Sequence, residues 1–227
     1  MYEYTKAFVL LRRNEGESLP GFRERYLKEH TGNLLQRSGI HRYNANLVEE
    51  IPAILTPESG FGNPGSGVDA VDELWCDAQD VPFSLYEKDF TIVGAYGINE
   101  RIFIEYTPDW KIGERSPWLK RINFLRRRAD MTHEGFERHW RGVHGPMGAK
   151  IHRLPKYVQN LLHPLTDYTE EWDGSVQMHF WSPEEFVKGF FPDEESRKLV
   201  LADVKNFIGD WGGSRPAFLL SEYIMRA

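Results

Sequence analysis

Apolar residues come in short runs along this chain, and polar or amphipathic stretches separate the runs. Such runs, bounded by polar residues or alternating with them, are typical of β-strands. The strands predicted in this way are residues 7–13, 43–48, 71–76, 101–106, 121–127, 157–162, 176–181 and 217–224. Ser18 and Thr132 are suited to cap a helix after the first strand of each half. Further helices are predicted to open near Asp77 and at Ser182, so the pattern βαββαβ occurs twice.

The two halves are related by an internal repeat. Residues 6–48 align with residues 120–162 at a constant offset of 114 without gaps. Ten identical pairs result, where roughly two or three are expected from ordinary residue usage. They are Lys6/Lys120, Leu11/Leu125, Arg12/Arg126, Arg13/Arg127, Gly21/Gly135, Phe22/Phe136, His30/His144, Tyr43/Tyr157, Asn46/Asn160 and Leu47/Leu161. The chain is therefore predicted to be a tandem duplication.

Two helices cover only one face of a four-stranded sheet, so the other face must be buried by another layer. The second half of the chain is the natural cover, which predicts an α+β fold. In it, the antiparallel sheets of two tandem ferredoxin-like modules pack into an intrachain dimeric-type α/β barrel. We expect module 1 at residues 1–107, a linker at 108–118 and module 2 at 119–227.

The composition and net charge of the chain indicate which kinds of partner it binds. The chain has 227 residues and no apolar run near the ~20 residues that span a bilayer, so we expect no membrane partner. A net charge of −6 gives no basic surface for nucleic acid. The single cysteine, Cys76, allows no intrachain disulfide. The apolar run at 7–11 is too short for a signal peptide, so we expect a cytoplasmic protein with a small-molecule partner. Aromatic side chains expected on exposed helices are able to form a dimer interface, so a homodimer is also possible.

A histidine ends the same helical stripe in both modules. Phe136, Trp140 and His144 follow one another at intervals of four, as do Phe22, Tyr26 and His30. Residues spaced in this way share one helix face, and the aromatic side chains indicate that it packs on the sheet. Each imidazole is then partly buried at the inner edge of its helix. A histidine in such a place is often only a packed core residue.

Polar replacements favour module 2 as the site of chemistry. Arg121 and Asn123 stand where module 1 has alanine and valine, and Gln159 stands where it has Ala45. We also align His179 with Leu74 in the third strand. Buried polar groups cost about 1–3 kcal/mol each unless they are paired, so several in one layer predict a cavity. The alternative is that some of them cross-link the sheets or face solvent.

Other site types lack support in the sequence. His133, His139 and His144 are spaced by six and five residues, which does not match the spacing of helical zinc ligands, so no metal is expected. No Gly-x-Ser-x-Gly sequence is present, and Cys76 lies within a predicted strand. Acid–base chemistry by histidine is the remaining catalytic option.

The helix motif Phe-x3-Trp-x3-His-Gly-Pro, followed by Tyr-x-x-Asn-Leu, resembles the EthD family of dimeric α/β-barrel proteins. The stretch 131–162 carries the best match, and 72–77 resembles the third strand of the family. The resemblance implies a cavity between each sheet and its helices. Relatives include cofactor-free isomerases, cyclases, decarboxylases and haem proteins. In the isomerases a helix histidine, similar in position to His30 and His144, is thought to move protons. Module 1 departs from the motif with His30-Thr31-Gly32, so a second site at His30 and Tyr43 is expected to be degenerate.

The leading hypothesis is a cofactor-independent lyase, isomerase or cyclase acting on a small carbonyl-bearing aromatic or lactone-like metabolite. His144 is the expected general base and acid, and Tyr157 and Asn123, with Arg121, are expected to bind a developing enolate oxygen. The other expected substrate contacts are Trp140, Gln159, His179, Phe180 and Trp181. Two alternatives stay open: a protein that binds a hydrophobic metabolite without converting it, and a haem enzyme with His144 or His179 as axial ligand.

Overall fold

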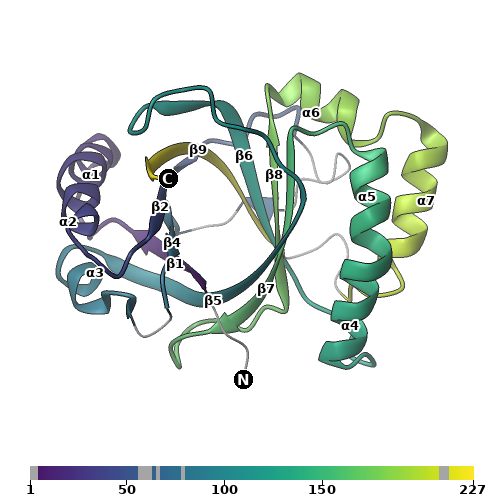
Figure 1. Cartoon of the computed structure of the whole chain (residues 1–227), viewed down its shortest axis with the longest axis horizontal. Helices are drawn as coiled ribbons and strands as arrows, with labels where there is room; N and C mark the ends of the chain where they lie inside the picture. The colour runs from purple at the N-terminus through teal and green to yellow at the C-terminus, as the bar shows by residue number, and fades with distance from the viewer. Residues whose placement is uncertain (1–4, 56–62, 65–66, 78–79, 210–214) are drawn as a thin grey trace.

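Eight antiparallel strands close into one barrel, with helices outside it on two opposite sides (Figure 1). The computed structural model describes residues 5–55, 63–64, 67–77, 80–209 and 215–227. The strands are β1 (Lys6–Arg12), β2 (Arg42–Glu49), β4 (Ala70–Trp75), β5 (Thr91–Ile104), β6 (Arg115–Leu125), β7 (Lys156–Pro164), β8 (Gly174–Phe180) and β9 (Pro216–Arg226). Their order is β2-β4-β1-β5-β7-β8-β6-β9, and pairing of β9 with β2 completes the ring. The short β3 (Asn63–Pro64) runs parallel to β9.

The two halves share one topology, which confirms the predicted fold class. In each half the third strand lies between the first and second, and the fourth lies on the other side of the first. The halves are joined at their sheet edges, by the β5–β7 and β2–β9 ladders. The expected face-to-face packing is therefore realised as a single closed sheet. Closure leaves none of these eight strands with an open edge.

The helices follow the predicted order with two differences. They are α1 (Leu19–Arg25), η1 (Tyr26–His30), α2 (Thr31–Leu35), α3 (Phe83–Asp89), α4 (His133–His139), η4 (Trp140–His144), α5 (Gly145–Ile151), α6 (Pro183–Phe190) and α7 (Glu194–Val204). Ser182 caps α6 as predicted, but α7 is an additional helix in the second half. The helix expected near Asp77 begins at Phe83, and residues 78–79 lie outside the described residues.

Two strands begin earlier than their apolar runs suggest. Strand β5 starts at Thr91, because its first residues pair with β1 before the later ones pair with β7. Strand β6 starts at Arg115, so residues 115–118 of the expected linker are strand residues. A strand that crosses from one half to the other has no single apolar face, and its amphipathic pattern is therefore interrupted.

Alternate side chains of each strand face the helices or the barrel interior. On β1, Ala7, Val9 and Leu11 pack in a core with the helices of the first half. The neighbouring Phe8 and Leu10 pack in a separate apolar core inside the barrel. Because both faces are buried, the strands read as nearly continuous apolar runs.

A cluster of charged side chains fills one part of the barrel interior. Lys120 binds the carboxylates of Glu73 and, at 2.8 Å, Glu222. Lys6, its counterpart in the repeat, binds Glu73 at 3.0 Å and Glu100 at 2.5 Å. Burial lowers the pKa of Lys120 to about 7, although Glu222 acts against this shift. The two equivalent lysines thus meet at one carboxylate, Glu73, and link strands from both halves.

Removing that carboxylate is expected to destabilise the barrel. The substitution Glu73→Gln leaves two buried ammonium groups without a shared partner, and loss of one partner of a buried ion pair costs about 3–5 kcal/mol. Urea unfolding measures this change in the free energy of unfolding. The exposed Glu87 on α3 provides the control, because Glu87→Gln should change stability by no more than about 0.5 kcal/mol. Equal stabilities of the two variants would contradict the structural role of Glu73.

Candidate active site between sheet and helices

A small cavity lies between the sheet and the helices of the second half. Its volume is about 40 Å³, which is enough for water-sized groups. Five of the residues expected from the sequence line it, namely Arg121, Asn123, Trp140, His144 and Tyr157. They come from β6, from the helix that follows it and from β7. The structure therefore brings these five side chains together.

The helix that carries His144 is built to place the imidazole at the cavity. The Thr132 hydroxyl accepts a hydrogen bond from the Gly135 amide at 3.1 Å and caps its start, as predicted. A π-helical turn, Trp140–His144, then widens the helix before α5 begins at Gly145. A Cβ at Gly145 would lie 2.2 Å from the Phe103 ring. The glycine of the His-Gly-Pro motif thus allows the helix to approach β5 closely.

His144 forms a pair with a carboxylate that the sequence analysis did not identify. Its Nδ1 is 2.8 Å from Asp203 Oδ2, and Asp203 Oδ1 is 2.8 Å from His139 Nε2. Burial would raise the pKa of Asp203, but the hydrogen bonds from His144 and His139 outweigh it and hold this pKa below its ordinary value. A charged carboxylate at Nδ1 favours the tautomer with its proton there. Nε2 of His144 is then the basic nitrogen.

The π-helical turn also corrects an expectation about spacing. Residues five apart were expected to point to different sides of the helix, yet His139 and His144 reach the same carboxylate. A π-helical turn contains more residues than an α-helical turn, so it brings positions i and i+5 onto one side. Among the described residues, no group of three or more potential ligands is arranged to hold a metal ion.

The cavity wall carries polar groups with unused hydrogen-bonding capacity. In the described part of the chain, Asn123 Oδ1 and Trp140 Nε1 are buried without a partner. The Tyr157 hydroxyl accepts a hydrogen bond from Gln159 Nε2 at 2.8 Å, so its own proton can be donated to another acceptor. Burial raises the pKa of Tyr157, and the phenol remains protonated at neutral pH. Gln159 supports the site through Tyr157.

Positive charge is also present at the cavity. Arg121 is buried close to the rings of Phe186 and Phe190, and Arg215 lines the same space. Burial, with a smaller effect of Arg215, lowers the pKa of Arg121 to about 9. The guanidinium therefore still carries its charge at neutral pH. An anionic oxygen in this cavity would be stabilised by both arginines.

His152 was not expected at the cavity. Its Nδ1 hydrogen-bonds the Phe190 carbonyl oxygen, and its ring stacks on the Phe190 ring at 4.3 Å. Burial lowers its pKa to about 4, so the imidazole is neutral at neutral pH. With the proton held on Nδ1, Nε2 of His152 can only accept a hydrogen bond.

Three expected contact residues lie elsewhere. His179 points into the barrel, where its Nε2 is 3.1 Å from Glu222 Oε2. Phe180 packs in the core beneath α6, on Phe186. Trp181 is 58% exposed and lies against Trp118. Neither of these aromatic residues lines the cavity. The homodimer expected from exposed aromatic side chains stays a prediction.

Strand register explains the displacement of His179. Tyr43 pairs with Leu74, and its counterpart Tyr157 pairs with Met178. The equivalence of His179 with Leu74 is therefore wrong by one residue. A shift of one residue moves a side chain to the opposite face of a sheet. The true counterpart of His179 is Trp75, and both side chains face the barrel interior.

In the first half, the equivalent site is filled by side chains. Asp72 is fully buried and accepts hydrogen bonds from Tyr26, Tyr43 and Tyr86 at 2.5, 2.8 and 2.9 Å. His30 Nε2 lies 2.7 Å from the same carboxylate. Burial and the negative charge of Asp72 raise the pKa of all three tyrosines well above the ordinary value. His30 and Tyr43 thus belong to a closed polar cluster around one carboxylate.

One comparison with known proteins concerns the second half of the chain. Residues 128–210 match the EthD domain. The matched stretch contains the helix that carries His144 and the helix that carries Asp203. The comparison with curated sequences gives no significant match. No helix among the described residues is both long enough and apolar enough to cross a membrane.

Similar solved structures support the barrel fold of the whole chain. One, an anthrone oxidase-like protein, has a TM-score of 0.56 and 11% identity, covering 97% of this chain and 92% of the other. A mutant chlorite dismutase from Candidatus Nitrospira defluvii has a TM-score of 0.53 and 12% identity, covering 95% and 90%. At such low identity these likenesses concern the fold. The stretch that matches the EthD domain thus lies within one half of a barrel that the other half of the chain completes.

Protonation of Asp203 is expected to weaken the EthD domain in acid. Its folded-state pKa is depressed, so its charge stabilises the fold above the ordinary pKa of about 3.9 and the effect is lost as the pH falls through the folded-state value. The stability difference between wild type and Asp203→Asn should shrink below about pH 4, as measured by urea unfolding. The exposed Asp167 supplies the control Asp167→Asn, which should show no such trend. A constant difference would disprove the interaction with the two histidines.

Proposed function

We propose that the EthD domain of this protein is an acid–base enzyme that moves a proton at a carbon next to a carbonyl group. The observation that carries the proposal is the His144–Asp203 pair beside buried hydrogen-bonding groups. A carboxylate behind an imidazole orients it and stabilises the imidazolium that forms during proton transfer. This is the arrangement required for a general base that later acts as an acid.

In this proposal His144 Nε2 takes the proton from the α-carbon, and the electron pair of the broken C–H bond moves to the carbonyl oxygen. The Tyr157 hydroxyl and the charge of Arg121 stabilise the enolate oxygen, because both lie at the same cavity. In an isomerisation the imidazolium then returns the proton to a different carbon of the conjugated enolate, and the carbonyl re-forms. In an elimination the enolate re-forms the carbonyl and makes a C=C bond, the bond from the β-carbon to the leaving group breaks, and the imidazolium gives its proton to that group. No oxidant or reductant is required for either outcome.

Asn123 and Trp140 are proposed to orient the substrate. Asn123 Oδ1 is an acceptor and Trp140 Nε1 is a donor, and both are buried without a partner among the described residues. A substrate hydroxyl on Asn123 and a second oxygen on Trp140 would satisfy them. Such groups select a substrate that carries matching polar atoms, since leaving them unpaired costs free energy.

The size of the cavity requires that its wall move when a ring-bearing substrate enters. A volume of about 40 Å³ is well below the ~300 Å³ of a small ligand site. Phe190 and Phe191 line the cavity at the end of α6, where the chain leaves the helix. We propose that this corner opens, since loops at element ends absorb such changes most readily.

The proposed substrate class is a small aromatic ketone or lactone. The cavity wall is rich in flat apolar side chains, including Trp140, Phe190 and Phe191. The likeness to an anthrone oxidase-like protein supports this class, because an anthrone is an aromatic ketone.

Haem is the alternative raised by the sequence. The donor set at His144 suits an axial ligand, since metal-ligating histidines commonly bind a carboxylate through the second nitrogen. The cavity does not suit the macrocycle, which is many times larger than the space observed. His179 is buried against Glu222 and has no room beside it for haem. The residues present therefore do not fit haem, and no step is assigned to it.

Exchange of carbon-bound protons in D2O tests the proposal directly. 2-Tetralone is a suitable probe because it has acidic C–H groups next to a carbonyl. Anthrone is a second probe, because the protons on its C10 are made acidic by conjugation with the carbonyl through the aromatic rings. The wild-type protein is expected to accelerate deuterium incorporation, measured by NMR. His144→Gln should reduce this rate at least about 100-fold and Asp203→Asn by about 10- to 100-fold, as expected for loss of a general base and of its orienting partner.

His133 provides the matched control because its side chain is 74% exposed on the same helix. His133→Gln should exchange at the wild-type rate. Retention of the wild-type rate by His144→Gln would disprove the role of His144. Binding of the probes without any exchange would favour the metabolite-binding alternative, and a Soret band after addition of haemin that is lost in His144→Ala would favour the haem alternative.

A further inference from the structure

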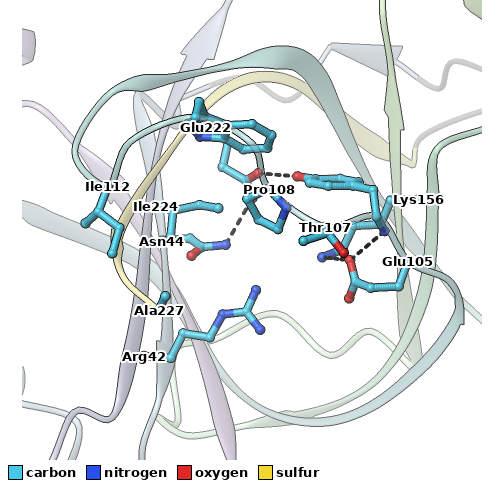
Figure 2. A pocket seen from close by; sticks show the side chains of 12 residues that line it. Arg42, Asn44, Glu105, Thr107, Pro108, Ile112, Lys156, Glu222, Ile224 and Ala227 are labelled. Atoms are coloured by element: carbon cyan, nitrogen blue, oxygen red, sulfur yellow. Dashed lines mark hydrogen bonds and ion pairs between the residues drawn. The ribbon is translucent and has the colours of Figure 1, made fainter.

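A second and larger cavity lies at the mouth of the barrel (Figure 2). Its volume is about 460 Å³, and it shares no lining residue with the cavity at His144. Its wall is formed by the first residues of β2 and β7, the last residues of β9 and the segment at 105–112. The buried Glu222 lies at its inner end and connects it to the charged cluster inside the barrel.

Arg42 supplies positive charge to this cavity. Its guanidinium points into the open space in Figure 2 and lies 4.2 Å from the centre of the Trp75 ring. Within the described part of the chain, no hydrogen bond or ion pair occupies it. The other cation of the wall, Lys156, is bound to Glu105 at 2.8 Å. An arginine with open donors on a rigid aromatic support is suited to bind a planar carboxylate.

Asn44 supplies an acceptor two residues further along β2. Its Nδ2 donates to Glu222 Oε1 at 3.1 Å, which fixes the amide because an ionised carboxylate can only accept. Burial would raise the pKa of Glu222, but Lys120 and His179 hold this pKa well below its ordinary value. Asn44 is 2% exposed, and its Oδ1 has no partner among the described residues. A ligand with a hydroxyl or amide proton would satisfy this oxygen.

The rest of the wall is largely flat and apolar. Pro108, Trp110, Ile112 and Ile224 line the cavity. The Tyr106 hydroxyl is 3.1 Å from Glu222 Oε2, which holds this ring beside the mouth. Apolar walls with a few fixed polar groups are typical of small-molecule sites, and the volume lies within their usual range.

We propose that the mouth of the barrel is a binding site for a small aromatic hydroxycarboxylic acid. The carboxylate binds Arg42, the ring packs against the apolar wall and the hydroxyl donates to Asn44 Oδ1. Arg42 and Asn44 lie on the same face of β2 about 7 Å apart along the strand. Both side chains therefore line the same cavity, where one small ligand can contact the two polar groups. The site is independent of the acid–base function proposed for the EthD domain.

Titration with 4-hydroxybenzoate tests the site, with calorimetry for affinity and NMR of the Trp110 indole for location. Arg42→Gln should weaken binding at least about tenfold, because it removes a charge-assisted contact. In the wild type, the neutral 4-hydroxybenzamide and the hydroxyl-free benzoate should each bind at least about fivefold more weakly. Asn44→Ala should abolish the preference for 4-hydroxybenzoate over benzoate.

Two controls keep the result specific. Arg138 is exposed on α4, so Arg138→Gln should bind 4-hydroxybenzoate like the wild type. His144→Gln should also bind it normally, which separates this site from the proposed active site. Urea unfolding of Arg42→Gln and Asn44→Ala checks that both variants remain folded. No binding to the wild type at millimolar concentration, or equal binding to folded Arg42→Gln, would overturn the proposal.

Discussion

The closed arrangement of the strands depends on two buried lysines that share one carboxylate. Lys6 and Lys120 occupy equivalent places in the repeat and meet at Glu73. A buried charge is tolerated only when its partners are in place, so the ion pairs favour the strand arrangement that brings all three together. That arrangement is the closed ring, in which the edge of each half is covered by the other. The larger cavity lies at the mouth of this ring and is lined by strands of both halves.

The barrel separates two environments that differ in chemistry. On the outer face of the second half, a histidine and an aspartate meet beneath helices in a space too small for more than water. At the mouth of the interior, a larger space is bordered by Arg42 and by Glu222, a carboxylate that Lys120 and His179 keep charged. Both environments result from the alternating direction of side chains along the strands, because neighbouring residues of one strand point to opposite faces of the sheet.

The repeat and the topology could be predicted from the sequence because strand periodicity and a constant offset are local signals. The convergence of Asn123, His144 and Tyr157 was predicted from the polar replacements in the second half, the helical stripe that ends at His144 and the resemblance to the EthD family. Asp203 was missed because it lies 59 residues from His144, on a helix that has no counterpart among the described residues of the first half. His179 was misplaced because its strand was aligned without the pairing register. Lys6 and Lys120 were recognised as a matching pair, yet apolar periodicity alone gave no reason to place them inside the barrel.

The contrast between Asp72 and Val176 has an evolutionary consequence. Pairing places these residues at equivalent positions, and Asp72 gathers three tyrosines and a histidine where Val176 leaves a hollow. In a barrel built from two identical subunits, every substitution occurs at both sites at once. Covalent duplication removes that coupling, so one copy can become a rigid structural support while the other keeps room to diverge toward new chemistry.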